Sequence, residues 1–400
     1  MAIAALWLAL GIAMPDAVIV DAVRTPIGRA FKGSLAQLRP DEMGAFVVDA
    51  LLERNPSVDP ASIEELYCGV GLPQGLQAFN LARIMVLLSA RLPVSVNGAT
   101  ISRYCASSLE SIRQAANGVR AGQGDAYIAA GVEWVSRYNE AVEGARPQDQ
   151  NEKLQGRNGQ PDAYITMGLT AENVAERYEV SRADMDKYAQ RSQELAVASQ
   201  ESGFFDREIV PVPLPGGGEA AKDDGPRPSS TLEKLAELEP AFKEGGVVTA
   251  GNSCPLNDGA AAVLVMSDAR AAELGLRPRA RIITAATAAI DPEYMGVAPI
   301  GAIRKVLDRA GMSIGAVETV ELNEAFAAQV IPIMDECDIP LEKLNPHGGA
   351  IALGHPFGMT GARIMTTLLN GLETDDKTIG LEAMCVAGGQ GEAMLVERLN

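Results

Sequence analysis

Short aliphatic runs alternate with amphipathic segments along most of the chain. A short apolar run bounded by turn residues is typical of a buried strand, whereas apolar residues at helical spacing indicate a helix with one buried face. We predict strands at 17–22, 66–70, 126–132, 260–266, 279–284, 317–321, 378–385 and 393–397. We predict helices at 41–54, 105–122, 170–179, 181–203, 300–310, 324–335 and 361–371. This alternation predicts an α/β fold with mostly parallel strand pairing.

The segment 136–250 interrupts the alternation. It is more polar than its surroundings and contains a Gly/Pro-rich stretch and a charged cluster. Ser181 is the expected N-cap of its longer helix. We interpret the segment as a domain inserted between two similar α/β halves, which are expected at 17–135, completed by 251–278, and at 279–400.

The chain begins with an apolar run from Ala2 to Met14. The run is too short to cross a bilayer and lacks the basic residues that precede the apolar part of a secretory signal. We predict that residues 1–16 form an N-terminal extension, with a targeting signal as the alternative. No other stretch has the length and hydropathy of a transmembrane helix, so no membrane span is expected.

The charge balance restricts the ligands and partners of the protein. The 400-residue chain has 34 basic and 52 acidic side chains, which gives a formal net charge of −18. Such a charge disfavours binding to nucleic acid or docking to an anionic membrane. A phosphorylated ligand would therefore need a local basic pocket.

Cysteines and histidines are few. The cysteine spacing predicts neither a disulfide framework nor a zinc site, and it is typical of a reducing compartment, so we expect a cytoplasmic protein. Any mechanism that needs an imidazole has to use His347 or His355, because the chain has no other histidine. The five cysteines are Cys68, Cys105, Cys254, Cys337 and Cys385.

Cys105 is the first candidate for chemistry. It precedes small polar residues, including Ser107 and Ser108, near the start of a predicted helix. Unpaired N–H groups and the dipole at a helix N-terminus lower the pKa of a thiol and favour the reactive thiolate. A structural cysteine that packs as a small apolar residue is the alternative interpretation.

His355 lies in a segment rich in glycine. Glycines at 348, 349, 354, 358 and 361 let the backbone bend tightly and approach a ligand closely. Pro356 restricts the backbone after His355 and so fixes the direction of the imidazole. We predict a functional role for His355, and His347 in the same segment stays an open candidate.

Two further motifs complete the inventory. Cys385 is followed by Ala387 and two glycines, where backbone N–H groups could bind an oxyanion. Asn323 lies at a predicted strand-to-helix junction, where it could cap the helix or orient a water. The residues include two thiols, a constrained imidazole and an amide, but no metal-ligand set and no Gly-x-Gly-x-x-Gly fingerprint. This combination predicts covalent acyl transfer through cysteine.

These residues resemble the thiolase family, nearly from end to end. The resemblance implies a five-layered α-β-α-β-α fold of two similar halves with an inserted loop domain that carries much of the coenzyme A site. It also implies a homodimer or homotetramer. The matching motifs follow the family's order and lie at 20–28, 74–83, 168–175, 251–252, 257–261, 323–326, 354–356 and 385–391.

The resemblance assigns roles to individual residues. Cys105 is similar to the family's nucleophile, His355 to the imidazole that activates it, and Cys385 to the thiol that shuttles protons. Asn323 is similar to the residue that holds a catalytic water and forms one oxyanion hole with His355. The backbone N–H groups of Cys105 and Ala387 would form the other. Coenzyme A would act as co-substrate, and no permanently bound cofactor is expected. Substrate and coenzyme A contacts are expected from Met167, Arg227, Cys254 and Gly388.

Four positions depart from the family's pattern. Ser102 stands where Asn is usual, and Ser108 stands where Gly is frequent. Ala387 replaces a usual Gly, which keeps the N–H group but restricts φ. Cys254 stands where many members carry a Ser beside the pantetheine of coenzyme A. The resemblance therefore does not imply a hydrogen bond from this position to the pantetheine. Arg227 matches a position associated with the nucleotide end of coenzyme A.

Thr166 bears on the substrate because it stands where acetoacetyl-CoA-forming members typically carry His. We therefore expect a degradative 3-ketoacyl-CoA thiolase (acetyl-CoA C-acyltransferase) of fatty acid β-oxidation, a pathway in which it could associate with the other enzymes. It would cleave 3-oxoacyl-CoA with coenzyme A through an acyl-Cys105 intermediate. The alternatives are an acetyl-CoA acetyltransferase for short chains, a ketosynthase, which would pair one Cys with two His, and a non-catalytic acyl-CoA-binding scaffold.

Overall fold

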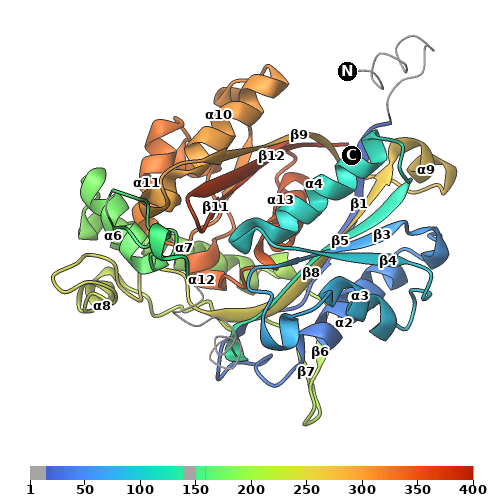
Figure 1. The fold of residues 1–400 in the computed structure, drawn as a ribbon, viewed down its shortest axis with the longest axis horizontal. Helices are drawn as coiled ribbons and strands as arrows, with labels where there is room; N and C mark the ends of the chain where they lie inside the picture. Colours follow the sequence, from blue (N-terminus) through green and yellow to red (C-terminus); the bar gives the residue numbers. More distant parts are fainter. Residues whose placement is uncertain (1–14, 138–149, 158, 400) are drawn as a thin grey trace.

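The computed structural model describes residues 15–137, 150–157 and 159–399 (Figure 1). The whole apolar run 2–14 therefore lies outside the described residues. The main sheet consists of β1 (Ala17–Arg24), β2 (Gly28–Arg29), β3 (Glu65–Val70), β4 (Asn97–Ile101), β5 (Ala126–Trp134), β8 (Asn257–Ser267), β9 (Ala280–Ala289), β10 (Thr319–Leu322), β11 (Ile379–Val386) and β12 (Gln390–Arg398). Its strand order is β10-β11-β12-β9-β1-β8-β5-β3-β4, with β2 paired to β8.

The two ends of this sheet repeat the same arrangement. In the N-terminal half, β3 pairs in parallel with β4 and β5, and β8 lies antiparallel between β5 and β1. In the C-terminal half, β10 pairs in parallel with β11, and β12 lies antiparallel between β11 and β9. A parallel bridge from Val320 to Leu344 takes the place of β4. The halves join where Val18 and Ile19 pair with Arg281 and Ala280.

The prediction of mostly parallel pairing is wrong. The pairs β5·β8, β8·β1, β1·β9, β9·β12 and β12·β11 are all antiparallel. The physical cause of the error is that apolar cores cover both faces of β8. Ala261 and Val263 contact one apolar core while Ala260 and Ala262 contact another. A strand buried on both faces reads as a continuous apolar run, which is the pattern typical of parallel strands.

Helices form three layers around the two half-sheets. The helices are α2 (Pro40–Arg54), α3 (Leu81–Leu88), α4 (Ser107–Arg120), α6 (Met167–Arg177), α7 (Arg182–Glu201), α8 (Leu232–Ala236), α9 (Asp268–Glu273), α10 (Pro299–Ala310), α11 (Ala327–Glu336), α12 (Ala350–Leu353) and α13 (Thr360–Thr374). α4 and α13 lie side by side, with α4 against strands of the N-terminal half and α13 against strands of both halves (Figure 1). α2 and α3 cover the outer face of the N-terminal half, and α10 covers that of the C-terminal half with α11 beside it. This arrangement confirms the predicted five-layered fold class.

The central helices approach each other closely. A Cβ added at Gly361 of α13 would lie 2.3 Å from the backbone nitrogen of Leu109 on α4, so only glycine allows this contact. The Ser108 hydroxyl accepts a hydrogen bond of 2.8 Å from Ala362 N. That bond satisfies an N–H group in the first turn of α13 that has no partner within its own helix. The contacts fix the starts of α4 and α13 against each other, and each start follows a residue predicted to be catalytic.

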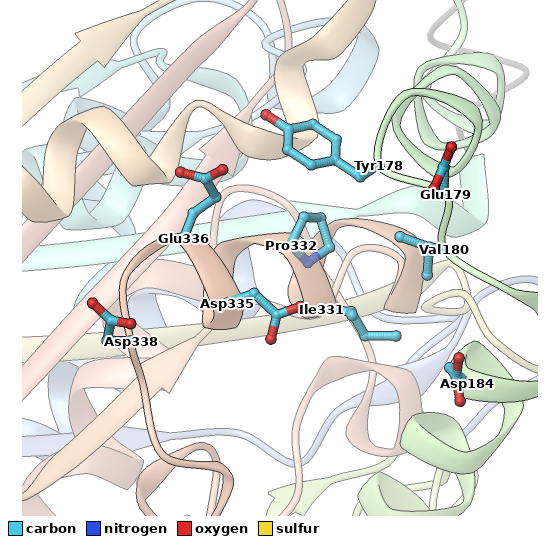
Figure 2. A pocket seen from close by; sticks show the side chains of 9 residues that line it. All are labelled: Tyr178, Glu179, Val180, Asp184, Ile331, Pro332, Asp335, Glu336 and Asp338. Carbon is cyan, nitrogen blue, oxygen red and sulfur yellow. The ribbon is translucent and has the colours of Figure 1, made fainter.

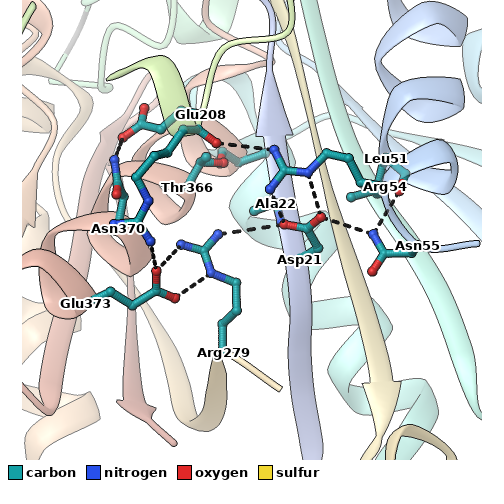
Figure 3. A network of polar contacts seen from close by, with 12 residues as sticks. Asp21, Ala22, Leu51, Arg54, Asn55, Glu208, Arg279, Thr366, Asn370 and Glu373 are labelled. Carbon is teal, nitrogen blue, oxygen red and sulfur yellow. Dashed lines mark hydrogen bonds and ion pairs between the residues drawn. The ribbon is translucent and has the colours of Figure 1, made fainter. Parts of the chain in front are cut away.

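A polar network ties the halves together where β1 meets its neighbours (Figure 3). Asp21 on β1 forms an ion pair of 3.0 Å with Arg54 and accepts a hydrogen bond of 3.0 Å from Asn55, both at the end of α2. Arg279, just before β9, pairs with Glu373 of α13 at 2.6 Å. The network therefore links an outer helix, the strand at the joint and a central helix.

The polar segment between the halves contains α6, α7, α8 and a short hairpin of β6 (Val212–Pro213) and β7 (Glu219–Ala220). Ser181 caps α7 as predicted, because its hydroxyl accepts a hydrogen bond of 3.1 Å from Asp184 N. α7 contacts α11 and α12, so this segment packs against the C-terminal half. Within the described ranges, no helix is long and apolar enough to cross a membrane. The cytoplasmic location stays a prediction.

Candidate active site

Cys105 lies in the 3-10 turn η3 (Tyr104–Ala106), between β4 and α4. The first turn of α4 can approach the sheet because glycines lie beneath it. A Cβ at Gly69 would lie 2.3 Å from Ser108 N, and one at Gly131 would lie 2.5 Å from Ser108 Cβ. The predicted position of Cys105 at the start of a helix is therefore confirmed.

The His355 imidazole is buried, and both of its nitrogens have partners. Its Nδ1 lies 2.7 Å from the Thr360 hydroxyl, which donates its proton to Pro356 O at 2.7 Å. The hydroxyl oxygen therefore accepts from Nδ1–H, which leaves Nε2 without a proton. Asn323 Nδ2 donates to this Nε2 at 3.2 Å. The tautomer presents a basic nitrogen to the site.

Asn323 connects His355 to Cys385. Both Asn323 and Cys385 are fully buried. The Asn323 side chain hydrogen-bonds His355 Nε2 and lies close enough to Cys385 to lower the pKa of its thiol, against the larger effect of burial. Its Oδ1 atom has no hydrogen-bond partner among the residues that the structure describes. The amide thus directs its NH₂ group to the two predicted proton-transfer residues.

Three thiols gather beside this amide. Cys385 and Cys254 lie close enough to Cys105 for a charge on either to raise the pKa of its thiol. Burial is the largest cause and raises the pKa of Cys105 well above its ordinary value, while the nearby Ala387 N–H opposes the shift. Burial raises the pKa of Cys385 to about 11.

The nucleophile and its base are both neutral at rest. Burial is the main cause that lowers the pKa of His355 to about 3, with a smaller contribution from the positive charge of Arg363. At neutral pH the imidazole is therefore unprotonated, and Cys105 is a thiol. Transfer of the Cys105 proton has to accompany nucleophilic attack, which is general-base activation rather than a preformed ion pair.

Glu324 fixes the loop that carries Asn323. Its buried carboxylate accepts hydrogen bonds from Tyr188 at 2.8 Å and Ser192 at 2.6 Å on α7. It also accepts from Asn345 Nδ2 at 2.8 Å and from Ile351 N at 3.1 Å. These tertiary bonds hold residues 323–326 in a non-helical conformation, so α11 begins at Ala327 rather than at the predicted position 324.

Glu133 holds the loops on the other side of the site. Its buried carboxylate accepts hydrogen bonds of 2.7 Å from Gly71 N and from Gly358 N, and one of 2.6 Å from Gln77. Gly358 follows His355 in the same loop, so one carboxylate joins the loop after β3 to the histidine loop. Sequence reasoning missed Glu133 because its partners, two backbone N–H groups and the Gln77 side chain, are far away in the chain.

Three of the residues predicted to bind the oxyanion or coenzyme A lie near the catalytic loops, namely Ala387, Gly388 and Cys254. Ala387 keeps φ outside the left-handed region, whereas Gly388 and Gly389 have φ of 78° and 79°. The replacement of the family's glycine by Ala387 therefore causes no backbone strain. Cys254 is tied to the Asn323 loop, because its N–H donates to Ala325 O at 3.0 Å. The oxyanion roles themselves stay predictions.

Met167 and Arg227 both belong to the segment between the two halves. Met167 is the first residue of α6 and packs against the C-terminal core. Arg227 is exposed, and its backbone N–H donates to Gln193 of α7 at 2.8 Å. Its neighbour Gly225 lies against α12, because a Cβ there would be 2.1 Å from Ala352 O. The Arg227 segment therefore passes beside the short helix that precedes His355.

His347 has a structural environment. Its ring stacks on Phe204 with centroids 3.7 Å apart, and its Nδ1 lies 3.4 Å from the Ser199 hydroxyl. Burial lowers the pKa of His347, although Asp375 partly opposes this effect. These contacts place His347 between α7 and α13, whereas His355 faces Asn323. The open candidate is thus separated from the thiols, which removes the second imidazole that a ketosynthase would need.

A separate cavity of about 520 Å³ lies at the junction of α6, α7 and α11 (Figure 2). Its lining residues are Tyr178, Glu179, Val180, Asp184, Ile331, Pro332, Asp335, Glu336 and Asp338. None of the predicted site residues is among them. Among the residues that the structure describes, no group of three or more His, Cys, Asp or Glu side chains could hold a metal ion.

The chain matches two family models. One, described as the thiolase N-terminal domain, covers residues 17–269, and the other, described as the thiolase C-terminal domain, covers residues 276–398. The chain belongs to the thiolase family. This thiolase is 43% identical to the β-ketoadipyl-CoA thiolase of Acinetobacter baylyi, with 96% of this chain and 100% of that one covered. It is 42% identical to the 3-ketoacyl-CoA thiolase of Saccharophagus degradans, with 96% and 98% covered.

Solved thiolase structures share the fold. The acetyl-CoA acetyltransferase of Bacillus anthracis superimposes with a TM-score of 0.88 at 37% identity, covering 97% of this chain and 100% of that one. The dimeric peroxisomal thiolase of Saccharomyces cerevisiae gives a TM-score of 0.90 at 36% identity, covering 97% and 98%. The resemblance found in the sequence motifs is thereby confirmed.

Proposed function

We propose that this protein catalyses the thiolytic cleavage of 3-oxoacyl-CoA by coenzyme A, giving acetyl-CoA and a shortened acyl-CoA. The observation that carries the proposal is the Asn323 amide, which hydrogen-bonds His355 Nε2 and lies close enough to Cys385 to lower the pKa of its thiol. Cys105 lies beside them. One site thus combines a nucleophile, a base and a second proton-transfer group, the set that covalent acyl transfer requires.

In the first half-reaction, His355 Nε2 takes the Cys105 proton as the sulphur attacks the 3-oxo carbon. The C2–C3 bond breaks, the acyl group stays on Cys105, and the electron pair moves to the acetyl-CoA enolate. Cys385 then gives its proton to C2, which releases acetyl-CoA. The imidazolium formed on His355 becomes a donor to an oxyanion, and Asn323 would hold the catalytic water beside it.

In the second half-reaction, coenzyme A enters and gives its thiol proton to the Cys385 thiolate. The coenzyme A thiolate attacks the acyl-Cys105 thioester, and Cys105 leaves as the sulphur that His355 reprotonates. The N–H groups of Cys105 and Ala387 would bind the thioester oxyanion, since the Ala387 N–H lies near enough to Cys105 to lower the pKa of its thiol. Release of acetyl-CoA before coenzyme A binds predicts ping-pong kinetics.

Coenzyme A is proposed as a co-substrate that comes and goes, with no resident cofactor. Arg227 would meet its nucleotide end, since this exposed guanidinium offers a local positive charge on an otherwise acidic protein. Met167, Cys254 and Gly388 are proposed to line the path of the substrate towards Cys105. Cys254 has the best support, because its thiol lies near Cys105 and Cys385.

The preferred substrate is proposed to be a 3-oxoacyl-CoA longer than acetoacetyl-CoA. Thr166, which stands where acetoacetyl-CoA-forming thiolases typically carry His, is exposed and caps no backbone group of α6 with its side chain. Each methylene buried contributes about 0.8 kcal/mol. We therefore expect kcat/KM for 3-oxooctanoyl-CoA to exceed that for acetoacetyl-CoA by at least about tenfold.

A thiolysis panel of acetoacetyl-CoA, 3-oxooctanoyl-CoA, 3-oxohexadecanoyl-CoA and 3-oxoadipyl-CoA tests this preference. A role in fatty acid β-oxidation requires the two long monocarboxylic substrates to be cleaved best. The highest kcat/KM for 3-oxoadipyl-CoA would instead place this protein with the relatives named for that substrate. A strong preference for acetoacetyl-CoA would favour the acetyl-CoA acetyltransferase alternative, and no cleavage of any member would contradict the proposed function.

Self-association through the β4 edge is also proposed. β4 ends the sheet, and the neighbouring apolar side chains Phe79, Leu87 and Val94 are 90%, 55% and 71% exposed. An open strand edge beside exposed apolar residues is typical of a protein interface. Light scattering should give a dimer or a larger assembly, and a Phe79→Asp, Val94→Asp variant should dissociate. Leu341→Asp, at another exposed apolar position, is the matched control, and a monomeric parent protein would contradict the proposal.

A further inference from the structure

Gln193 is a buried residue on α7 to which the proposed reaction gives no task. Its Oε1 accepts a hydrogen bond of 2.8 Å from Arg227 N, and its Nε2 donates one of 3.4 Å to Ile351 O in α12. These partners fix the orientation of the amide, because a backbone N–H has to face the oxygen and a carbonyl has to face the NH₂ group. The amide therefore joins the Arg227 segment to the short helix that precedes His355.

The backbone around Arg227 has little freedom. Pro226 and Pro228 flank it, and each proline fixes its own φ and has no N–H group. Pro228 also restricts Arg227, because the helical region is disfavoured for a residue that precedes proline. The Arg227 N–H is thus the single backbone donor of residues 226–228, and Gln193 binds it. A stiff segment held at this point sets the direction in which the Arg227 side chain leaves the backbone.

The residues before this segment are anchored in the core. Asp223 forms an ion pair of 2.8 Å with Arg24 of β1, and both side chains are fully buried. The Asp224 carboxylate accepts a hydrogen bond of 2.9 Å from Arg29 N. A buried ion pair resists separation, because a single charge left in the interior is strongly unfavourable. Gln193 therefore fixes the second end of a segment whose first end is already anchored.

We propose that Gln193 is a positioning residue that presents the Arg227 guanidinium to the nucleotide end of coenzyme A. The inference rests on the proposed function, in which Arg227 meets that end of the co-substrate. Among the residues that the structure describes, the exposed guanidinium has no hydrogen-bond or ion-pair partner, so its charge is available to a phosphate. Ordering a loop during binding costs affinity, and a segment that is ordered in advance avoids this cost. Gln193 thereby raises the affinity for the nucleotide through Arg227.

The test compares two substrates that differ only in the nucleotide. kcat/KM is measured for 3-oxooctanoyl-CoA and for 3-oxooctanoyl-pantetheine, which has the same acyl group and thiol arm. Gln193→Leu keeps a side chain of similar size and removes its polar atoms. We expect it to lower kcat/KM for the coenzyme A thioester at least about fivefold and to leave that for the pantetheine thioester within about twofold of the parent. An equal loss for both substrates would mean a merely structural role and would contradict the inference.

A double-mutant cycle shows whether Gln193 acts through Arg227. Arg227→Gln should lower kcat/KM for the coenzyme A thioester at least as much as Gln193→Leu does, and the double variant should show no further loss. Losses that multiply in the double variant would contradict a shared role. Ser199→Ala, another buried change on α7, is the matched control and should keep the parent values for both substrates.

A binding measurement works without turnover. Adenosine 3′,5′-bisphosphate, which represents the nucleotide end of coenzyme A, is titrated by calorimetry into the parent and into Gln193→Leu. We expect Kd to be at least about fivefold higher for the variant. If the parent cleaves neither substrate, the proposed function fails while the titration still decides the role of Gln193. A Kd within about twofold of the parent value, or no binding by the parent, would overturn the inference.

Discussion

Replacing Cys105 with Ala is expected to abolish both turnover and the covalent acyl-enzyme. The proposed reaction passes through a thioester on this sulphur. Without the thiol, the reaction loses the covalent intermediate that divides one difficult step into two easier ones. We expect kcat to fall by at least about 10⁴-fold, the range seen when a nucleophile is deleted from a site that retains its other groups. Intact mass after mixing with 3-oxooctanoyl-CoA should show an acyl adduct on the parent and none on Cys105→Ala.

The chain supplies a matched control for this change. Cys337→Ala removes another thiol, one that packs in the C-terminal core away from Cys105, and it should keep the adduct and the turnover. Because the Cys105 side chain is only partly buried, Cys105→Ala should leave the folded state intact, which circular dichroism can verify. An adduct that maps to another residue, with turnover retained in Cys105→Ala, would refute the assigned nucleophile.

His355→Gln is expected to slow acylation of Cys105 by at least about a thousandfold. The pKa of the resting Cys105 thiol is raised, so the thiol does not ionise unaided at neutral pH. Without the base, only a small fraction of Cys105 is in the reactive thiolate form. Gln can still accept a hydrogen bond from Asn323, which separates loss of the base from loss of the contact. Stopped-flow measurement of acyl-enzyme formation gives the rate directly.

His347→Gln is the natural counterpart, because it removes the only other imidazole in the chain. It should lose some stability through the stacking contact with Phe204 and keep acylation within about threefold of the parent. A large loss of acylation in His347→Gln, or an unchanged rate in His355→Gln, would contradict the assignment of the base.

The low pKa of His355 also affects stability at acidic pH. The folded protein binds a proton on this ring only near pH 3, whereas an unfolded chain does so near its ordinary value of 6.5. Between these values the unfolded state binds more protons, so this residue lowers the free energy of unfolding as the pH falls from 6.5 towards 3. The melting temperature of His355→Gln should accordingly decline less steeply than that of the parent over this window.

The elements that the sequence predicts best are those with a long and regular pattern. The helix predicted at 41–54 is observed as α2 (Pro40–Arg54), and Ser181 caps α7 as expected. The pattern predicts neither α3 nor β4, although they lie directly before Cys105 in the chain. β4 is an edge strand with half-exposed residues and a glycine, so it lacks the continuous apolar run that marks the buried strands.

The active-site residues also differ in how far the sequence predicts them. The residue types and sequence neighbours of Cys105, His355 and Cys385 are enough to indicate thiol chemistry. They do not indicate Thr360, although it lies five residues after His355. Its importance comes from a single hydrogen bond, to His355 Nδ1. Nothing in a local pattern of polarity distinguishes such a bond from an ordinary buried polar residue.

The sequence by itself determined the family, the repeated α/β rhythm and the residues able to carry out acyl transfer. These properties depend on residue type, on motif order and on periodicity, all of which are local. Only the tertiary structure decided strand direction, the separation of His347 from His355, and the hydrogen bond between Asn323 and His355. These depend on which distant segments meet, and that is set by packing of the two half-sheets around α4 and α13 rather than by any single segment.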